Sequence, residues 1–102
     1  MEIDPAVYDV ARKYFDLEYP GDGHVFLEDA RNWVYERRVA VQSANKKSPP
    51  LFDMVIHDCF SGGGVPQHLF SVEFWNDLKS IIKPGGVVAV VRQNLRHLTS
   101  LV

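Results

Sequence analysis

The stretch that begins at Phe52 and ends at Phe70 constrains the fold of this chain more than any other. It opens with a short apolar run, Met54 to Ile56, which is rich in β-branched residues and is typical of a strand buried on both faces of a parallel sheet. The run stops at Asp58, and three consecutive glycines follow at positions 62 to 64. No helix is predicted to start directly after Asp58, so helix capping does not explain its carboxylate. The stretch predicts a loop in which backbone approaches a ligand beside an acidic side chain.

The rest of the chain alternates between short apolar runs and amphipathic stretches. We predict helices over about residues 5–16, 30–41 and 72–83, with N-caps at Asp4, Asp29 and Ser71. Strands are predicted at residues 1–4, 24–28 and 87–91, in addition to the one that ends at Asp58. Four strands alternating with three helices predict an α/β fold with a doubly wound parallel sheet and right-handed crossovers.

Composition limits the class of protein. The chain has 102 residues, 46% of them hydrophobic and 24% charged, with a net charge of -2, which indicates one globular domain and no nucleic-acid partner. The single cysteine, Cys59, excludes an internal disulfide. We expect no membrane span, because the sequence has no long apolar run, and no metal site, because the four histidines lack the spacing of metal ligands. We expect a cytoplasmic location, because the N-terminus lacks the pattern of a secretory signal.

Ligands of open parallel sheets bind outside the carboxyl ends of the strands. In this sequence those ends carry Glu2, Asp4, Asp29 and Asp58, so we expect an acidic rim suited to hydroxyl groups, amino groups and cations. Helix capping is an alternative explanation for Asp4 and Asp29. Glu2 and Asp58 are not placed to cap a helix, and they are therefore the stronger candidates for a site.

Several motifs occur here in a familiar order. They are Glu2-Ile3-Asp4-Pro5, Asp29-Ala30, the Asp58 loop and Lys83-Pro84-Gly85-Gly86. With this order and spacing, residues 1–91 resemble the spermidine synthase-like (polyamine aminopropyltransferase) family, whose Rossmann-like fold is shared with class I S-adenosylmethionine-dependent methyltransferases. Residues 92–102 are expected to be a divergent tail in which Leu95, Leu98 and Leu101 line one side of a short helix.

The resemblance implies roles for individual residues. Glu2 matches the acidic residue that binds the ribose hydroxyls of S-adenosylmethionine or its decarboxylated form, and Ile3 matches the apolar residue that packs on the adenine. Asp29 and Ala30 match the residues that contact the adenine, and Asp58 matches the catalytic aspartate that helps to orient and deprotonate the attacking amine. The substrate loop would contain Ser61, Gly62, Gly63, Gly64 and His68.

The sequence departs from the family pattern in two ways. Ser61 stands where aminopropyltransferases have a second aspartate that holds the amine, so a methyl acceptor is an equally good interpretation. The usual first strand and its glycine-rich loop are expected before Glu2, and residues 1–102 do not include them. We therefore expect the chain alone to be an inactive fragment of a transferase. The alternative is a non-catalytic module whose exposed strand edges pair with a second copy, a missing N-terminal segment or another partner.

Two residues beside Asp58 have structural interpretations. His57 points to the opposite face of an ideal strand, and a packed or hydrogen-bonded role is favoured over catalysis. Cys59 is interpreted as a small packed residue, because the sequence shows no matching histidine and aspartate pattern for a nucleophile.

Overall fold

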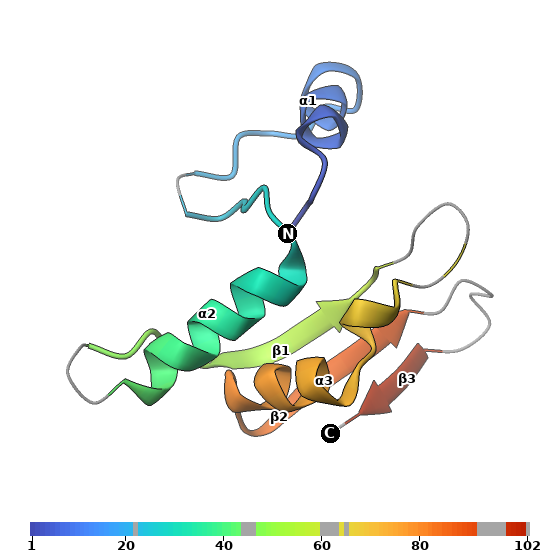
Figure 1. The fold of residues 1–102 in the computed structure, drawn as a ribbon. Coiled ribbons are helices and arrows are strands. Elements are labelled where there is room, and N and C mark those ends of the chain that lie inside the picture. The colour runs from blue at the N-terminus through green and yellow to red at the C-terminus, as the bar shows by residue number, and fades with distance from the viewer. Residues whose placement is uncertain (22, 44–46, 60–63, 65, 92–97, 102) are drawn as a thin grey trace. The chain divides into compact units, whose positions relative to one another are not determined.

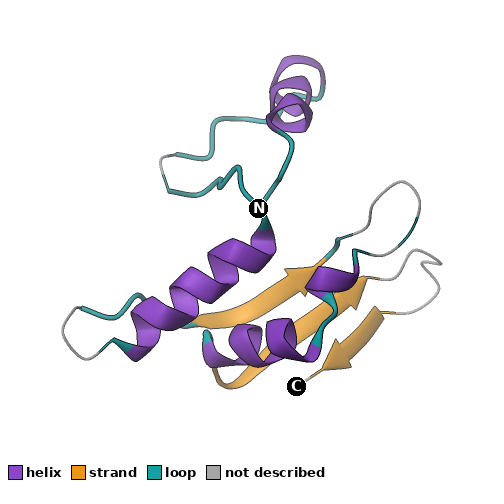
Figure 2. Cartoon of the chain, viewed as in Figure 1, coloured by secondary structure: helices purple, strands orange, loops and turns teal. Residues whose placement is uncertain are grey.

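The computed structural model describes residues 1–21, 23–43, 47–59, 64, 66–91 and 98–101 (Figure 1). Its contacts divide the chain into two compact units, Met1–Trp33 and Val34–Val102. In Figure 2 the strands are drawn as orange arrows, and all of them belong to the second unit.

The first unit contains the helix α1 (Pro5–Tyr14) and one strand-like contact. Asp4 is the N-cap of α1, as predicted, and its carboxylate accepts a hydrogen bond from the Ala6 N–H at 2.9 Å. The two predicted strands of this region are reduced to a single parallel bridge between Glu2 and Leu27. A two-stranded pairing is marginally stable on its own, which accounts for its shortness within this unit.

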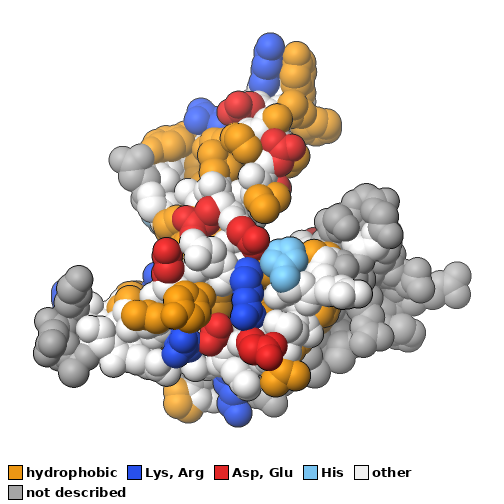
Figure 3. All heavy atoms as spheres, in the orientation of Figure 1, with side chains coloured by type: hydrophobic (Ala, Val, Ile, Leu, Met, Phe, Trp, Pro, Cys, Tyr) orange, Lys and Arg blue, Asp and Glu red, His pale blue; other side chains and the backbone are white. Residues whose placement is uncertain are grey.

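The predicted apolar face of α1 is exposed. Val7 is 51% exposed and Phe15 is 75% exposed, and no residue of the helix is buried. Figure 3 shows hydrophobic side chains gathered on the surface of α1. Periodicity therefore predicted the helix correctly but did not predict burial, since the described part of this small unit contains no buried residue at all.

The second unit is built on a three-stranded sheet in the order β1-β2-β3, formed by Phe52–His57, Ile82–Val91 and Leu98–Leu101. β1 and β2 are parallel, as predicted, and Val55 lies opposite Val88. β3 is antiparallel to β2. The expectation of a helix in the tail is therefore wrong for Leu98 and Leu101, because pairing with β2 holds this segment extended; Leu95 lies outside the described residues.

Helices occur close to their predicted positions. α2 spans Ala30–Gln42, a short 3-10 helix η1 spans Gln67–Leu69, and α3 spans Val72–Ser80. The Ser71 hydroxyl caps α3 by accepting a hydrogen bond from the Phe74 N–H at 3.2 Å. α3 ends earlier than predicted, because Ile82 already belongs to β2. None of the described helices is long and apolar enough to cross a membrane.

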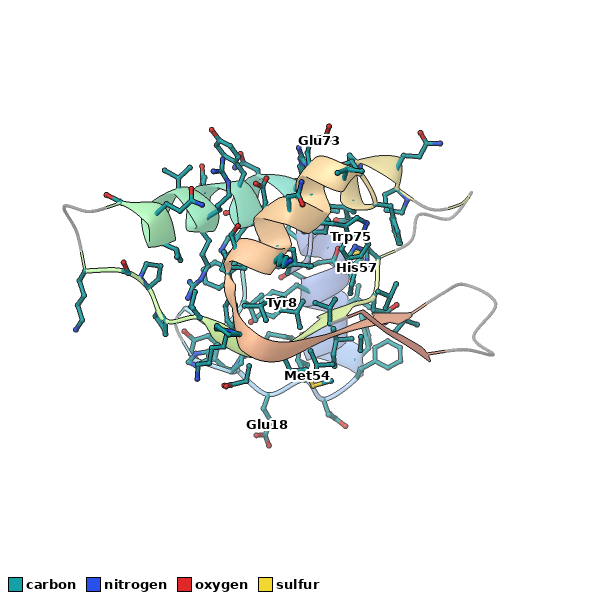
Figure 4. All side chains as sticks on the ribbon, turned by 90° about the horizontal axis from the view of Figure 1, so that it is seen from below. Tyr8, Glu18, Met54, His57, Glu73 and Trp75 are labelled. Atoms are coloured by element: carbon teal, nitrogen blue, oxygen red, sulfur yellow. The ribbon has the colours of Figure 1, made fainter. Side chains whose placement is uncertain are left out.

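The core lies between α3 and one face of the sheet. Figure 4 shows His57 and Trp75 on this side, whereas Met54 points away from α3. Met54 is 54% exposed and Ile56 is 64% exposed, so the opposite face of β1 is open within the described structure. The buried apolar residues of the unit are Val34, Leu69, Phe74, Leu78, Ile81, Val88 and Val90.

The predicted turn at Lys83 to Gly86 is an irregularity inside β2. Phe52 pairs with Ile82 and Met54 pairs with Val87, so the register shifts at this point. A Cβ at Gly86 would collide with the Ile82 side chain and would lie 3.0 Å from the Asp53 carbonyl oxygen. Glycine is therefore required here by the close approach of the two strands.

Candidate functional site

Asp58 is the first residue after β1, and its side chain is exposed. Its position at the carboxyl end of a parallel strand agrees with the sequence prediction. Within the predicted substrate loop, Gly64 has φ +151 with open space where a Cβ would be, and His68 is exposed in η1. The loop residues Ser61, Gly62 and Gly63 lie outside the described residues.

Glu2 is half-buried, and it has a local structural partner that sequence reasoning missed. Its Oε1 accepts a hydrogen bond from the Asp4 N–H at 3.0 Å. This bond orients the carboxylate at the start of α1, where unpaired backbone N–H groups attract an acceptor. The signal available in the sequence was an acidic residue two positions before Asp4, the predicted N-cap of this helix. Ile3, the predicted adenine contact, is 66% exposed.

Asp29 is half-buried and stands immediately before Ala30, the first residue of α2. Its Oδ1 accepts a hydrogen bond from the Arg31 N–H at 2.9 Å, and its carbonyl oxygen accepts one from the Trp33 N–H at 3.1 Å. The capping interpretation of Asp29 is confirmed by these bonds. The role of Asp29 and Ala30 in binding adenine stays a prediction.

The first unit brings two of the predicted site carboxylates to the same end of a strand pair. Glu2 is paired in parallel with Leu27, and Asp29 follows Leu27 by two positions. Two carboxylates at the carboxyl ends of parallel segments can accept hydrogen bonds from hydroxyl and amino groups. Asp58 belongs to the second unit and is not part of this pair.

His57 has the packed and hydrogen-bonded role that its strand position predicted. Its side chain is 4% exposed, and Nε2 donates a hydrogen bond to the Leu69 carbonyl oxygen at 2.8 Å. Its ring lies at centroid distances of 4.6 Å from Phe70, 5.6 Å from Phe74 and 5.0 Å from Trp75. Sequence reasoning missed this aromatic cluster, although Phe70 and Phe74 stand four positions apart at helical spacing.

The described residues contain no group of three or more His, Cys, Asp or Glu side chains arranged to hold a metal ion.

Known proteins share the sequence pattern of this chain. Residues 1–100 match the Spermine/spermidine synthase domain family, so the match continues beyond Val91. The chain is 40% identical over 90 residues to an N-terminal histidine N-methyltransferase of Emericella nidulans, which covers 88% of the chain and 15% of that protein. It is 31% identical over 88 residues to a polyamine aminopropyltransferase of Vibrio vulnificus, which covers 86% of the chain and 27% of that protein.

A solved structure has the same fold. The crystal structure of human methyltransferase-like protein 13 in complex with SAH aligns with a TM-score of 0.68 and 23% identity, over 92% of this chain and 43% of that chain. The fold is thus a partial Rossmann-like α/β fold of the class I methyltransferase type. The chain spans between 15% and 31% of the length of the curated relatives it matches. Its sequence match over residues 1–100 shows that the chain belongs to the spermine/spermidine synthase family.

Proposed function

We propose that this chain is part of a transferase that uses S-adenosylmethionine or its decarboxylated form as donor. The observation that carries the proposal is the parallel bridge between Glu2 and Leu27, which sets the carboxylates of Glu2 and Asp29 at one end of a strand pair. In this role Glu2 accepts hydrogen bonds from the two ribose hydroxyls, and Asp29 accepts one from the adenine amino group. Ile3, exposed beside Glu2, packs on the adenine, and Ala30 offers its backbone N–H.

Asp58 is the proposed base. In the transfer step, a nucleophile attacks the carbon bound to the sulfonium sulfur, the carbon–sulfur bond breaks, and a neutral thioether leaves. Asp58 accepts the proton that the nucleophile loses. Its exposed position at the strand end allows a small molecule to reach it. Ser61 does not supply the second charge that would hold a diamine, so the acceptor is an amine or another nucleophile and the group transferred is methyl or aminopropyl.

The 102-residue chain alone is proposed to lack transfer activity, because its residues do not include the glycine-rich loop that the family resemblance implies. Calorimetry with S-adenosylmethionine, its decarboxylated form and methylthioadenosine tests this. We expect no micromolar binding by the chain alone. We expect micromolar binding when residues 1–91 replace the aligned segment of the Emericella nidulans relative. Micromolar binding by the 102-residue chain would contradict the proposed inactivity.

The same titrations test the assignment of the donor site. Glu2→Gln in the chimaera keeps the side-chain shape and removes the charge, and it should weaken donor binding at least ~10-fold, as expected for the loss of charge-assisted hydrogen bonds. Glu73→Gln is the matched control, because Glu73 is exposed in the first turn of α3. Equal affinities for the Glu2 variant and the control would refute the assignment.

A second candidate function is supported by the open face and edge of β1. Within the described residues β1 pairs on one side only, with β2, and Met54 and Ile56 are exposed on its open face. Parallel sheets are usually covered on both faces. In this alternative the chain is a non-catalytic module that forms a homodimer or binds a protein segment through β1. Light scattering over a concentration series tests it, and a monomer at all concentrations with slow amide exchange along β1 would exclude it.

A further inference from the structure

His57 is the one residue with a polar or charged side chain that is buried in the described part of the chain. The Leu69 carbonyl oxygen can only accept a hydrogen bond, so the bond at 2.8 Å requires the proton on Nε2. In the neutral ring Nδ1 is then an acceptor, and this atom is buried without a hydrogen-bond partner. A phenylalanine or leucine would fill the same apolar space without leaving a buried polar atom unpaired. Packing alone therefore does not account for a histidine at this position.

The hydrogen bond connects two parts of the chain that lie 12 positions apart in sequence. His57 is the last residue of β1, and Leu69 is the last residue of η1. The rings of Phe70 and Trp75 flank the imidazole at 4.6 Å and 5.0 Å, and Figure 4 shows His57 beside Trp75 under α3. The ring is thus held by one directional bond and by close packing.

We infer that His57 is a positioning residue for Asp58, an inference that rests on the proposed role of Asp58 as base. Neighbouring side chains of a strand point to opposite faces, so a ring fixed under α3 directs the next side chain toward the other side. His57 is buried and Asp58 is exposed, as this alternation requires. The bond from Nε2 fixes the direction in which β1 ends, and a base is effective only when it is held within hydrogen-bond reach of its proton.

Two variants of the 102-residue chain separate positioning from packing. His57→Phe keeps the ring and removes the donor, whereas His57→Gln loses the ring and offers an amide N–H near the position of Nε2. The readout is amide exchange at Leu69 and Phe70, whose N–H groups donate to the carbonyl oxygens of Pro66 and Gln67 within this turn.

In His57→Phe we expect exchange at these two amides to be at least ~10-fold faster, and the backbone amide resonance of Asp58 to move, while exchange in α3 stays unchanged. In His57→Gln we expect both readouts to return most of the way to those of the unmodified chain. A structural role through packing predicts the reverse order, with phenylalanine tolerated and glutamine disruptive. That reverse order, or no change in either variant, would overturn the inference.

The nitrogen resonances of the imidazole give an independent signature. Nε2 should carry a proton, as its bond to the Leu69 carbonyl oxygen requires, and a ring without a proton on Nε2 would also overturn the inference. None of these amide or imidazole measurements requires the group-donating or group-accepting substrate of the proposed transferase. If Asp58 proves unnecessary for transfer, the proposed role of Asp58 as base fails, but the amide and imidazole results are unaffected. Failure of the proposed function can therefore be distinguished from failure of the inference about His57.

Discussion

Arg38 of α2 and Asp77 of α3 form an ion pair in which Nε lies 2.7 Å from Oδ1. The side chains are 27% and 14% exposed, so both charges are partly removed from water. Arg38 also donates a hydrogen bond from Nη1 to Oε1 of Gln42 at 2.9 Å, which limits the freedom of its side chain. The contact at Nε is a close charge pair and not a well-aligned hydrogen bond. It connects two helices that lie on the same face of the sheet (Figure 1).

We predict that Asp77→Asn lowers the free energy of unfolding by ~1–3 kcal/mol, because it leaves a partly buried guanidinium without its charged partner. The coupling energy between Arg38→Gln and Asp77→Asn should be measured by a double-mutant cycle in urea. The pair Lys83–Asp53 is the matched control, since its side chains are 51% and 83% exposed at a distance of 2.9 Å. Exposed pairs contribute about 0–1 kcal/mol. Equal coupling in the two cycles would contradict the account.

Gly86→Ala is predicted to destabilise the chain by ~1–3 kcal/mol, the usual cost of overpacking a tight site. The added methyl group would meet the Ile82 side chain and the carbonyl oxygens of Lys83 and Asp53, at 2.9 Å and 3.0 Å. The strands must separate at this point to accept it. Thermal unfolding followed by circular dichroism measures the effect.

Gly23→Ala is the comparison for Gly86→Ala. Gly23 has φ +76 and no atom within 4 Å of an added Cβ, so its substitution adds backbone strain without a collision. We expect a cost of ~1–2 kcal/mol there, from the left-handed conformation alone. Relief of the Gly86→Ala effect by Ile82→Leu, which removes the colliding Cγ2 methyl group, with no relief at Gly23, would identify the collision as the cause. An undiminished effect would show that the Ile82 contact is unimportant.

Ser71→Ala should lower stability by ~1 kcal/mol, because the Phe74 N–H loses the hydroxyl that caps α3. Ser80→Ala is a suitable control, since the Ser80 hydroxyl donates to the Asn76 carbonyl oxygen at the other end of the same helix, a bond that supports no unpaired N–H group. Urea unfolding of both variants is the measurement. A larger loss for Ser80→Ala than for Ser71→Ala would contradict the capping role.

Local patterns predicted most of this fold. The caps at Asp4, Asp29 and Ser71, the three α-helices and the parallel pair β1–β2 all follow from residue type and spacing. The antiparallel strand β3 was not predicted, because the identity of a short strand depends on the partner that pairs with it. The local role of Glu2 was missed for a different reason: a carboxylate that contacts a backbone N–H two residues away leaves no periodic pattern, and its only sign in the sequence is its place two residues before the N-cap.

The candidate site was predicted in part. The family and the strand-end positions of Glu2, Asp29 and Asp58 were available from sequence, because ligand sites of parallel sheets lie at strand ends. The hydrogen bond between His57 and Leu69 was not predicted, since it joins residues 12 positions apart and the backbone conformation of the intervening turn could not be predicted from residue patterns.

Asp58→Asn tests the central claim most directly. The measurement is turnover of the Emericella nidulans relative that carries residues 1–91 of this chain in place of its aligned segment, with a peptide that begins with histidine as acceptor. We predict that the variant loses at least ~100-fold in turnover, the scale of a lost general base, while the free energy of unfolding changes by less than ~1 kcal/mol because Asp58 is exposed. Asp53→Asn, an equally conservative change at a residue of β1 whose side chain is 83% exposed, should leave turnover unchanged. Near-normal turnover of the Asp58 variant, or its unfolding, would contradict the assignment of Asp58 as the base.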